Sequence, residues 1–191
     1  MVCALRDGNV ILMSADSAAT SESGFRVSRR DSKLFRLPVF ETRSRLRRDM
    51  LLGFCGEFIR FQFMSCRFKP PCIHPEQDAW HYMVSVFVPA LREFMVLHFG
   101  ESGGLILGSE SETLLVAFRK RIFSVFSNGQ VEETREEFSA IGAQEAALGA
   151  LHALRGSAEP SWDVLDTAMR AAEAYSSTVR APFDTELLFD N

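Results

Sequence analysis

Short apolar runs separated by turn residues fill the first third of the chain. Residues 2–6 and 10–14 are apolar and flank Asp7-Gly8-Asn9. Because Asp-Gly between apolar runs favours a tight turn, this pattern predicts a β-hairpin. Further strands are predicted at residues 33–38, where Pro38 is expected to end the strand, and at 50–54.

The spacing of apolar residues changes after residue 56. Residues 57–68 are densely apolar and lack glycine and proline, which favours a helix. A second helix is predicted at 78–98, with a kink or break at Pro89. Three segments are predicted as loops or turns, at residues 17–31, 69–75 and 103–104. The remaining predicted elements are strands at 105–108, 113–118, 121–126, 138–142 and 185–189, and helices at 144–154 and 161–175.

The order of these elements predicts the fold class. Strands that follow one another in hairpins form mainly antiparallel sheets, and helices that arrive in two blocks cover two faces. We therefore predict an α+β fold, a four-layer αββα sandwich of two mainly antiparallel sheets. No internal repeat is visible, and residues 1–191 are expected to form a single domain.

Composition and charge narrow the classes of function. The chain has 191 residues, 47% of them hydrophobic, and a net charge of −4, which excludes a largely disordered chain and gives no electrostatic reason to bind nucleic acid. No apolar run approaches the roughly 18 uncharged residues of a membrane span, and charges at Arg6 and Asp7 come too early for a signal peptide. We therefore expect a cytoplasmic protein with no membrane partner.

Cysteine and histidine spacing gives no sign of a metal site. The four cysteines form no CxxC pair, and the four histidines are scattered. The cysteines are expected to be reduced, with Cys3 and Cys55 buried in strands as small apolar side chains. Neither a metal nor another cofactor is predicted.

Several segments, taken in order, resemble the proteasome β-subunits and the bacterial HslV type of proteasome-like peptidase. These segments are Arg6-Asp-Gly8, the run from Val10 to Thr20 that contains Ala-Asp-Ser-Ala-Ala-Thr, Lys33-Leu-Phe-Arg-Leu37, Leu51-Leu-Gly-Phe-Cys-Gly56, Phe138-Ser-Ala-Ile-Gly142 before an alanine-rich helix, and Glu173-Ala-Tyr-Ser176. The resemblance extends over about residues 2–190. It implies the αββα fold of the N-terminal nucleophile (Ntn) hydrolases, in agreement with the element order.

The resemblance also implies a catalytic site. In this family the hydroxyl of an N-terminal threonine attacks a peptide carbonyl, and its free α-amine can act as the base. Asp16 matches the family aspartate, Lys33 the lysine that lowers the pKa of the nucleophile, and Gly56 the glycine whose N–H helps to bind the oxyanion. Read without the family, Asp16 is a strand end, Lys33 a solvated strand residue and Gly56 a strand-to-helix turn.

Glu173 and Ser176 resemble an Asp-Ala-Tyr-Ser element that supports the amine of the threonine. Glutamate is one methylene longer than the aspartate of the family. A position on the polar surface of a helix would also explain both residues.

Two positions depart from the pattern. Ala143 stands where the family has a serine, and no threonine stands at the start. Val2-Cys-Ala-Leu5 matches the apolar strand that follows the nucleophile in the family, so the resemblance implies a nucleophile at Met1 or one residue before it. The hairpin arithmetic agrees, because Asp16 should pair across from about that position. Cys3 lies only five residues from the turn glycine, too close to reach the Asp16 end of the hairpin, so a buried cysteine is the better interpretation.

Three interpretations of function stay open. The chain is a threonine-type peptidase subunit with an upstream threonine, a non-catalytic ring or scaffold subunit, or an Ntn amidase acting on a non-peptide bond. The resemblance implies a homo-oligomeric ring, peptide or protein substrates and an ATPase unfoldase as a partner. The phenylalanine-rich helices at 57–68 and 78–98 are expected to contribute to contacts between subunits.

Overall fold

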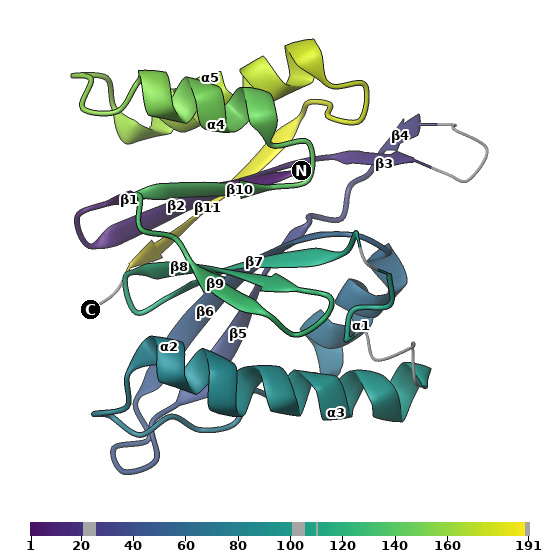
Figure 1. The fold of residues 1–191 in the computed structure, drawn as a ribbon, viewed down its shortest axis with the longest axis vertical. Coiled ribbons are helices and arrows are strands. Elements are labelled where there is room, and N and C mark those ends of the chain that lie inside the picture. The colour runs from purple at the N-terminus through teal and green to yellow at the C-terminus, as the bar shows by residue number, and fades with distance from the viewer. Residues whose placement is uncertain (21–25, 101–105, 110, 190–191) are drawn as a thin grey trace.

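The computed structural model describes residues 1–20, 26–100, 106–109 and 111–189. The chain forms four layers: two β-sheets packed face to face, with helices on the outer side of each (Figure 1). Every strand pair within the two large sheets is antiparallel. The predicted α+β sandwich of αββα type is thus confirmed.

The first sheet contains the predicted hairpin and the last strand of the described residues. Its strands lie in the order β10-β1-β2-β11, with bounds β1 (Val2–Asp7), β2 (Val10–Asp16), β10 (Phe138–Ile141) and β11 (Phe183–Phe189). Gly8 has a φ of +57° in the tight turn, a conformation that glycine adopts without strain. Val2 lies opposite Ala15, and the Asp16 N–H donates to the Met1 carbonyl at 3.2 Å. The hairpin therefore brings Asp16 directly beside Met1.

The second sheet has five strands in chain order. They are β5 (Leu34–Phe40), β6 (Arg47–Cys55), β7 (Thr113–Phe118), β8 (Arg121–Phe126) and β9 (Val131–Glu133). Pro38 does not end β5, because β5 is an edge strand, where a residue without an N–H is tolerated. The short strand β9 was not predicted.

The prediction of a strand at 105–108 is wrong for residues 106–108. Residue 105 lies outside the described residues, and 106–108 form bends. Gly108 has a φ of +109°, which turns the backbone away from a strand path. Within the polar stretch expected as a loop, β3 (Ala18–Thr20) and β4 (Arg26–Ser28) pair as a small ribbon that projects beyond the sheets (Figure 1).

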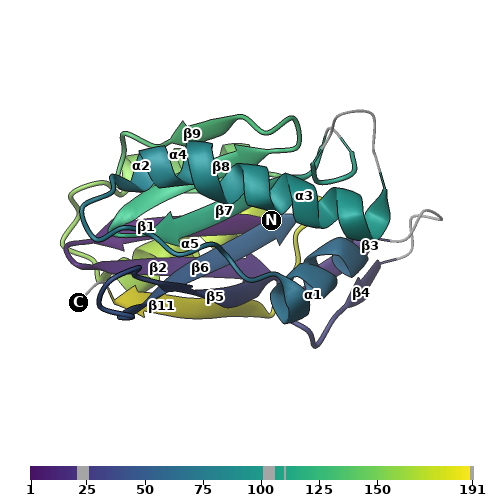
Figure 2. The ribbon, with the colours of Figure 1, turned by 90° about the horizontal axis from the view of Figure 1, so that it is seen from below.

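Helices cover both outer faces. They are α1 (Phe58–Arg67), α2 (Ala79–Tyr82), a π-helical turn (Met83–Phe87), α3 (Val88–Phe99), α4 (Glu145–Ala153) and α5 (Ser161–Tyr175). Seen from below, α2 and α3 run as one rod across the five-stranded sheet (Figure 2). Pro89 does not break this rod, because the π-helical turn just before it already alters the hydrogen-bond ladder that proline would interrupt.

The rod Ala79–Phe99 meets the length and composition test for a membrane-crossing helix, the one described helix that does so. A core helix of a soluble protein meets the same test, and here one face of the rod packs into the apolar core beneath the five-stranded sheet. The phenylalanines of these helices are largely internal: Phe61 and Phe87 are fully buried, and the ring of Phe63 stacks on Phe94 at 5.8 Å. The large apolar side chains that the helices below the five-stranded sheet do expose are Ile59, Trp80, Val84, Val96 and Leu97.

Side-chain alternation along β1 separates two cores. Met1 and Cys3 point to the layer of α4 and α5, where they join an apolar cluster with the helix residues. Val2 and Ala4 point the other way, into the cluster between the two sheets. Successive residues of a strand face opposite sides, so the direction of every side chain at the start of the chain follows from this pattern.

Candidate active site

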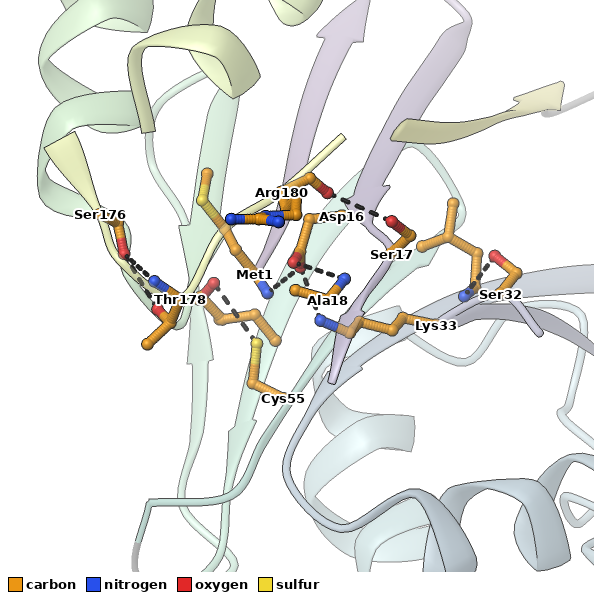
Figure 3. A network of polar contacts seen from close by, with 12 residues as sticks. Met1, Asp16, Ser17, Ala18, Ser32, Lys33, Cys55, Ser176, Thr178 and Arg180 are labelled. Carbon is orange, nitrogen blue, oxygen red and sulfur yellow. Dashed lines mark hydrogen bonds and ion pairs between the residues drawn. The ribbon is translucent and has the colours of Figure 1, made fainter. Parts of the chain in front are cut away.

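Asp16 lies at the centre of a buried cluster of charged groups at the end of β2. Its Oδ1 accepts a hydrogen bond from the Met1 amine at 2.5 Å and another from Lys33 Nζ at 2.6 Å (Figure 3). Its Oδ2 accepts the Ala18 N–H at 3.0 Å. The four residues come from the chain start, the end of β2, the start of β3 and the start of β5, so the hairpin and the sheet packing together build the cluster.

The cluster has more positive than negative charge. Two cationic nitrogens share one carboxylate oxygen, and the side chains of Asp16 and Lys33 are 0% and 9% exposed. In such a buried place, electrostatic interactions are weakly screened. Lys33 would keep its charge if a residue preceded Met1, and a cation here favours a group that gains negative charge, such as an alkoxide or a tetrahedral oxyanion.

The Met1 side chain points away from Lys33. Its thioether extends toward the helical layer, while its amine faces Asp16 and Lys33 (Figure 3). A residue placed directly before Met1 would continue β1 and direct its side chain to the same side as Val2, toward the second sheet. Val2 lies against Gly53 of β6, so the preceding side chain would lie near the end of β6, beside Lys33.

An open cavity of about 660 Å³ lies beside the Met1 amine. It is large enough for an additional residue and part of a substrate. Its lining includes Met1, Ala18, Ala19, Lys33, Cys55, Gly56, Glu57, Phe58, Ser109, Ser111, Glu112, Gly142, Ala143 and Thr178. One space is therefore lined by five residues that the sequence analysis singled out: Met1, Lys33, Cys55, Gly56 and Ala143.

Gly56 forms the turn between β6 and α1 with a φ of +146°. A Cβ at this position would lie 2.5 Å from Cγ of Glu112, so both the backbone conformation and the contact require glycine. Glu112 is buried, and its Oε1 accepts the Glu57 N–H at 2.9 Å. Desolvation by burial raises the pKa of the Glu112 carboxyl group.

Gly142 also lines the cavity and lies against Cys55 and Met1. A Cβ there would lie 2.8 Å from Cys55 Sγ and 3.2 Å from Met1 Cα. Cys55 donates its thiol to the Ile141 carbonyl at 3.5 Å, and it is only partly buried, contrary to the expectation of a buried strand cysteine. Cys55 ends β6, where the strand reaches the cavity, so its side chain is only partly covered.

Glu173 and Ser176 lie near the site without contacting the Met1 amine in any described interaction. Glu173 accepts the Ala181 N–H at 2.9 Å, and Ser176 Oγ lies 2.9 Å from Thr178 Oγ1. Thr178 lines the cavity and lies between Ser176 and Met1 (Figure 3). The geometry thus separates this pair from the cluster of Met1, Asp16 and Lys33.

Sequence reasoning missed Glu112 and Thr178. The signal for Glu112 is the pairing of Cys55 with Thr113, which places the next residues of the two strands, Gly56 and Glu112, opposite each other. No local motif marks Glu112, because its partner Glu57 lies 55 residues away in the sequence. Thr178 follows α5 in an irregular segment that has no pattern of its own.

Several solved structures share this architecture. A Thiobacillus denitrificans protein named BPH, in complex with epoxomicin, is 19% identical with a TM-score of 0.71, over 98% of this chain and 97% of that chain. Eukaryotic HslV from Trypanosoma brucei is 16% identical with a TM-score of 0.68, over 99% of both chains. Anbu from Pseudomonas aeruginosa, described as a helical assembly, is 16% identical with a TM-score of 0.67, over 99% of this chain and 81% of that chain.

No protein-family model and no curated protein matches the sequence. The structural likeness nevertheless extends over almost the whole chain, and it confirms the resemblance to HslV at the level of the fold. The chain therefore shares the αββα sandwich fold of these solved proteins.

Proposed function

We propose that this chain is a subunit of a proteasome-like, ring-forming peptidase whose nucleophile is a hydroxyl on a residue directly before Met1. The observation that carries the proposal is the shared Asp16 oxygen: Lys33 and the chain start meet there at the edge of an open cavity. The Met1 thioether cannot attack a carbonyl, and it points to the helical layer. A chain that begins at Met1 is therefore expected to be inactive as a peptidase.

The chemistry follows from the positions of the groups. A hydroxyl on the preceding residue attacks the peptide carbonyl carbon, and its proton passes to the free α-amine of that residue. Lys33 and the Gly56 N–H stabilise the oxyanion, and Asp16 holds Lys33 in place. The C–N bond then breaks, the leaving amine takes up the proton, and water hydrolyses the remaining ester.

A second candidate function has its own supporting observation. The Met1 amine already bonds Asp16, and the Met1 side chain is packed into the helical core, as expected for a subunit that contributes structure alone. Such a non-catalytic subunit would keep the fold and lack chemistry. An amidase acting on a non-peptide bond would use the same site and differ only in substrate.

Chains with defined first residues test the proposal. Release from a cleavable N-terminal fusion gives four chains: one starting at Met1, one with threonine before Met1, one with alanine before Met1, and Met1→Thr. Each is incubated with epoxomicin and its intact mass is measured. We expect a covalent adduct only on the chain with threonine before Met1, because only there does a hydroxyl face Lys33.

The other outcomes are equally decisive. Labelling of Met1→Thr alone places the nucleophile at residue 1 and contradicts the strand-parity argument. Absence of labelling in both threonine chains supports the non-catalytic subunit. If a labelled chain cleaves non-peptide amides and leaves peptides intact, the amidase interpretation holds. The intact mass of the native protein tests whether a residue precedes Met1 in the cell, and which residue it is.

A further inference from the structure

Glu112 is a buried carboxylate with an unusual set of partners. It is 1% exposed, lies just before β7 and contributes to the lining of the cavity beside Met1. Its two oxygens accept backbone N–H groups from both sides, Glu57 at 2.9 Å and Ser109 at 3.2 Å. Hydrogen bonds from two backbone N–H groups partly offset the cost of burying the charge, and they tie two loops to one side chain.

The stem of Glu112 also touches Gly56. The 2.5 Å separation between a Cβ built at Gly56 and Glu112 Cγ shows that the methylene groups lie directly against the glycine. The Glu57 N–H belongs to the peptide group that follows Gly56, so the hydrogen bond to Glu112 restrains the backbone on that side. Pairing of Cys55 with Thr113 restrains the other side.

The groups that face Glu112 come from two elements. At the start of α1, the Glu57 carboxylate raises the pKa of Glu112, and the Arg60 guanidinium lowers it. The backbone N–H groups of Glu57 and of Ser109, on the loop before β7, also lower the pKa of Glu112, each by a hydrogen bond to its carboxylate. Desolvation is the largest effect, and its direction is upward.

We propose that Glu112 is a positioning residue that holds the Gly56 turn in the orientation needed to bind an oxyanion, and that its protonation loosens this turn. The inference rests on the proposed function, since it assigns Gly56 to the oxyanion. A protonated carboxyl group has one good acceptor oxygen, so one of the two backbone N–H groups then loses its acceptor. The orientation of the turn, and with it the reactivity of the site, becomes sensitive to pH.

Hydrogen exchange tests the positioning without requiring activity. In the full chain beginning at Met1, Glu112→Gln replaces the carboxylate with an amide of the same size whose NH₂ cannot accept. We expect exchange at the backbone amides of Glu57 or Ser109 to accelerate roughly fivefold, read by mass spectrometry of peptides covering each amide. Glu132→Gln, an exposed change on β9, is the matched control and should leave these amides unchanged.

Epoxomicin labelling tests the consequence for the oxyanion. In the chain with threonine before Met1, Glu112→Gln should slow labelling about tenfold, because a displaced oxyanion donor costs at least that factor. The unsubstituted threonine chain should also lose reactivity as pH falls through the Glu112 titration, and Glu112→Gln should remove that part of the pH profile. Thermal melting of each variant confirms that it is folded.

Each result separates the two proposals. Unchanged exchange at both Glu57 and Ser109 overturns the positioning of the turn, whatever the activity. Faster exchange with an unchanged labelling rate and pH profile overturns the link to the oxyanion. Faster exchange in Glu112→Gln, with no labelling of any threonine chain, supports the positioning of the turn and contradicts the proposed function.

Discussion

Lys33 Nζ lies 2.6 Å from Asp16 Oδ1, the oxygen that also accepts the Met1 amine. One buried carboxylate therefore has two cationic partners. Loss of the carboxylate should destabilise the fold more than loss of one of the cations. Removing the carboxylate leaves two cations without a partner, whereas removing one cation leaves an intact pair.

This difference predicts unequal stabilities for Asp16→Asn and Lys33→Met, two variants that each remove one charge with little change in side-chain size. Asp16→Asn should lower the free energy of unfolding by about 3 kcal/mol, and Lys33→Met by about 1 kcal/mol, because the Met1 amine still pairs with Asp16 in the second variant. Urea denaturation followed by circular dichroism measures both. If Lys33→Met is as destabilising as Asp16→Asn, the Met1 amine does not compensate as the geometry indicates.

Two glycines should respond in opposite ways to alanine. Gly56→Ala places a methyl group 2.5 Å from Glu112 Cγ at a φ of +146°, and it should cost about 2–3 kcal/mol of stability. Gly149→Ala is the matched control: it lies inside α4 with nothing within 4 Å of the new methyl group, and it should gain about 0.5–1 kcal/mol. The denaturant midpoints of the two variants measure these changes in stability. An unchanged midpoint for Gly56→Ala would show that the turn can shift to accept the methyl group.

The cysteines should differ strongly in reactivity. Burial raises the pKa of Cys3 to about 12, so its thiolate is scarce at pH 8, whereas Cys66 and Cys72 are exposed. Iodoacetamide at pH 8 should modify Cys66 and Cys72 rapidly and leave Cys3 unmodified in the folded chain, as peptide mass spectrometry would show. The same reagent in guanidinium chloride should reach all four. Fast modification of Cys3 in the native chain would contradict its burial beneath α4 and α5.

Whether a feature of the fold or of the site can be predicted from the sequence depends on how far apart in the chain its determining residues lie. The position of Asp16 beside the chain start follows from counting residues around the Gly8 turn, a local matter. The contact of Glu112 with Gly56 depends on the register between β6 and β7, and α1, α2, the π-helical turn and α3 lie between these strands in the sequence. No local sequence pattern determines how the residues of β6 pair with those of β7.

The error at Pro38 has a similar cause. Pro38 ends a strand in the local pattern, but the sheet order places it at an edge, where it does no harm. The roles assigned to Glu173 and Ser176 stay predictions: in the chain beginning at Met1, their side chains interact with Ala181 and Thr178. Short motifs identify residue types, whereas the final contacts depend on the path of the chain between them.

The proposed self-assembly has a testable surface. Leu97 on α3 is 77% exposed and has Val96 beside it, also exposed, on the outer side of the five-stranded sheet. If subunits associate through this face, Leu97→Glu should shift the mass measured by light scattering toward the 21.4 kDa of one chain. Leu46→Glu, in the hairpin between β5 and β6, is the control and should leave the mass unchanged. A monomeric unsubstituted chain at micromolar concentration would contradict assembly altogether.

The last prediction concerns Ala143, which lines the cavity directly after Gly142. A Cβ at Gly142 would lie 3.6 Å from the Met1 nitrogen, so the segment that carries Ala143 runs close to the position where a preceding residue would begin. We expect a hydroxyl at residue 143 to hydrogen-bond the free amine of that residue and to orient it as a base. In the chain with threonine before Met1, Ala143→Ser should therefore raise the epoxomicin labelling rate about tenfold. Ala143→Val adds bulk without a hydroxyl and should give no increase. Equal rates for Ala143→Ser and the unsubstituted threonine chain would show that other groups already orient the amine. The alanine at residue 143 would then not limit the reactivity of the site.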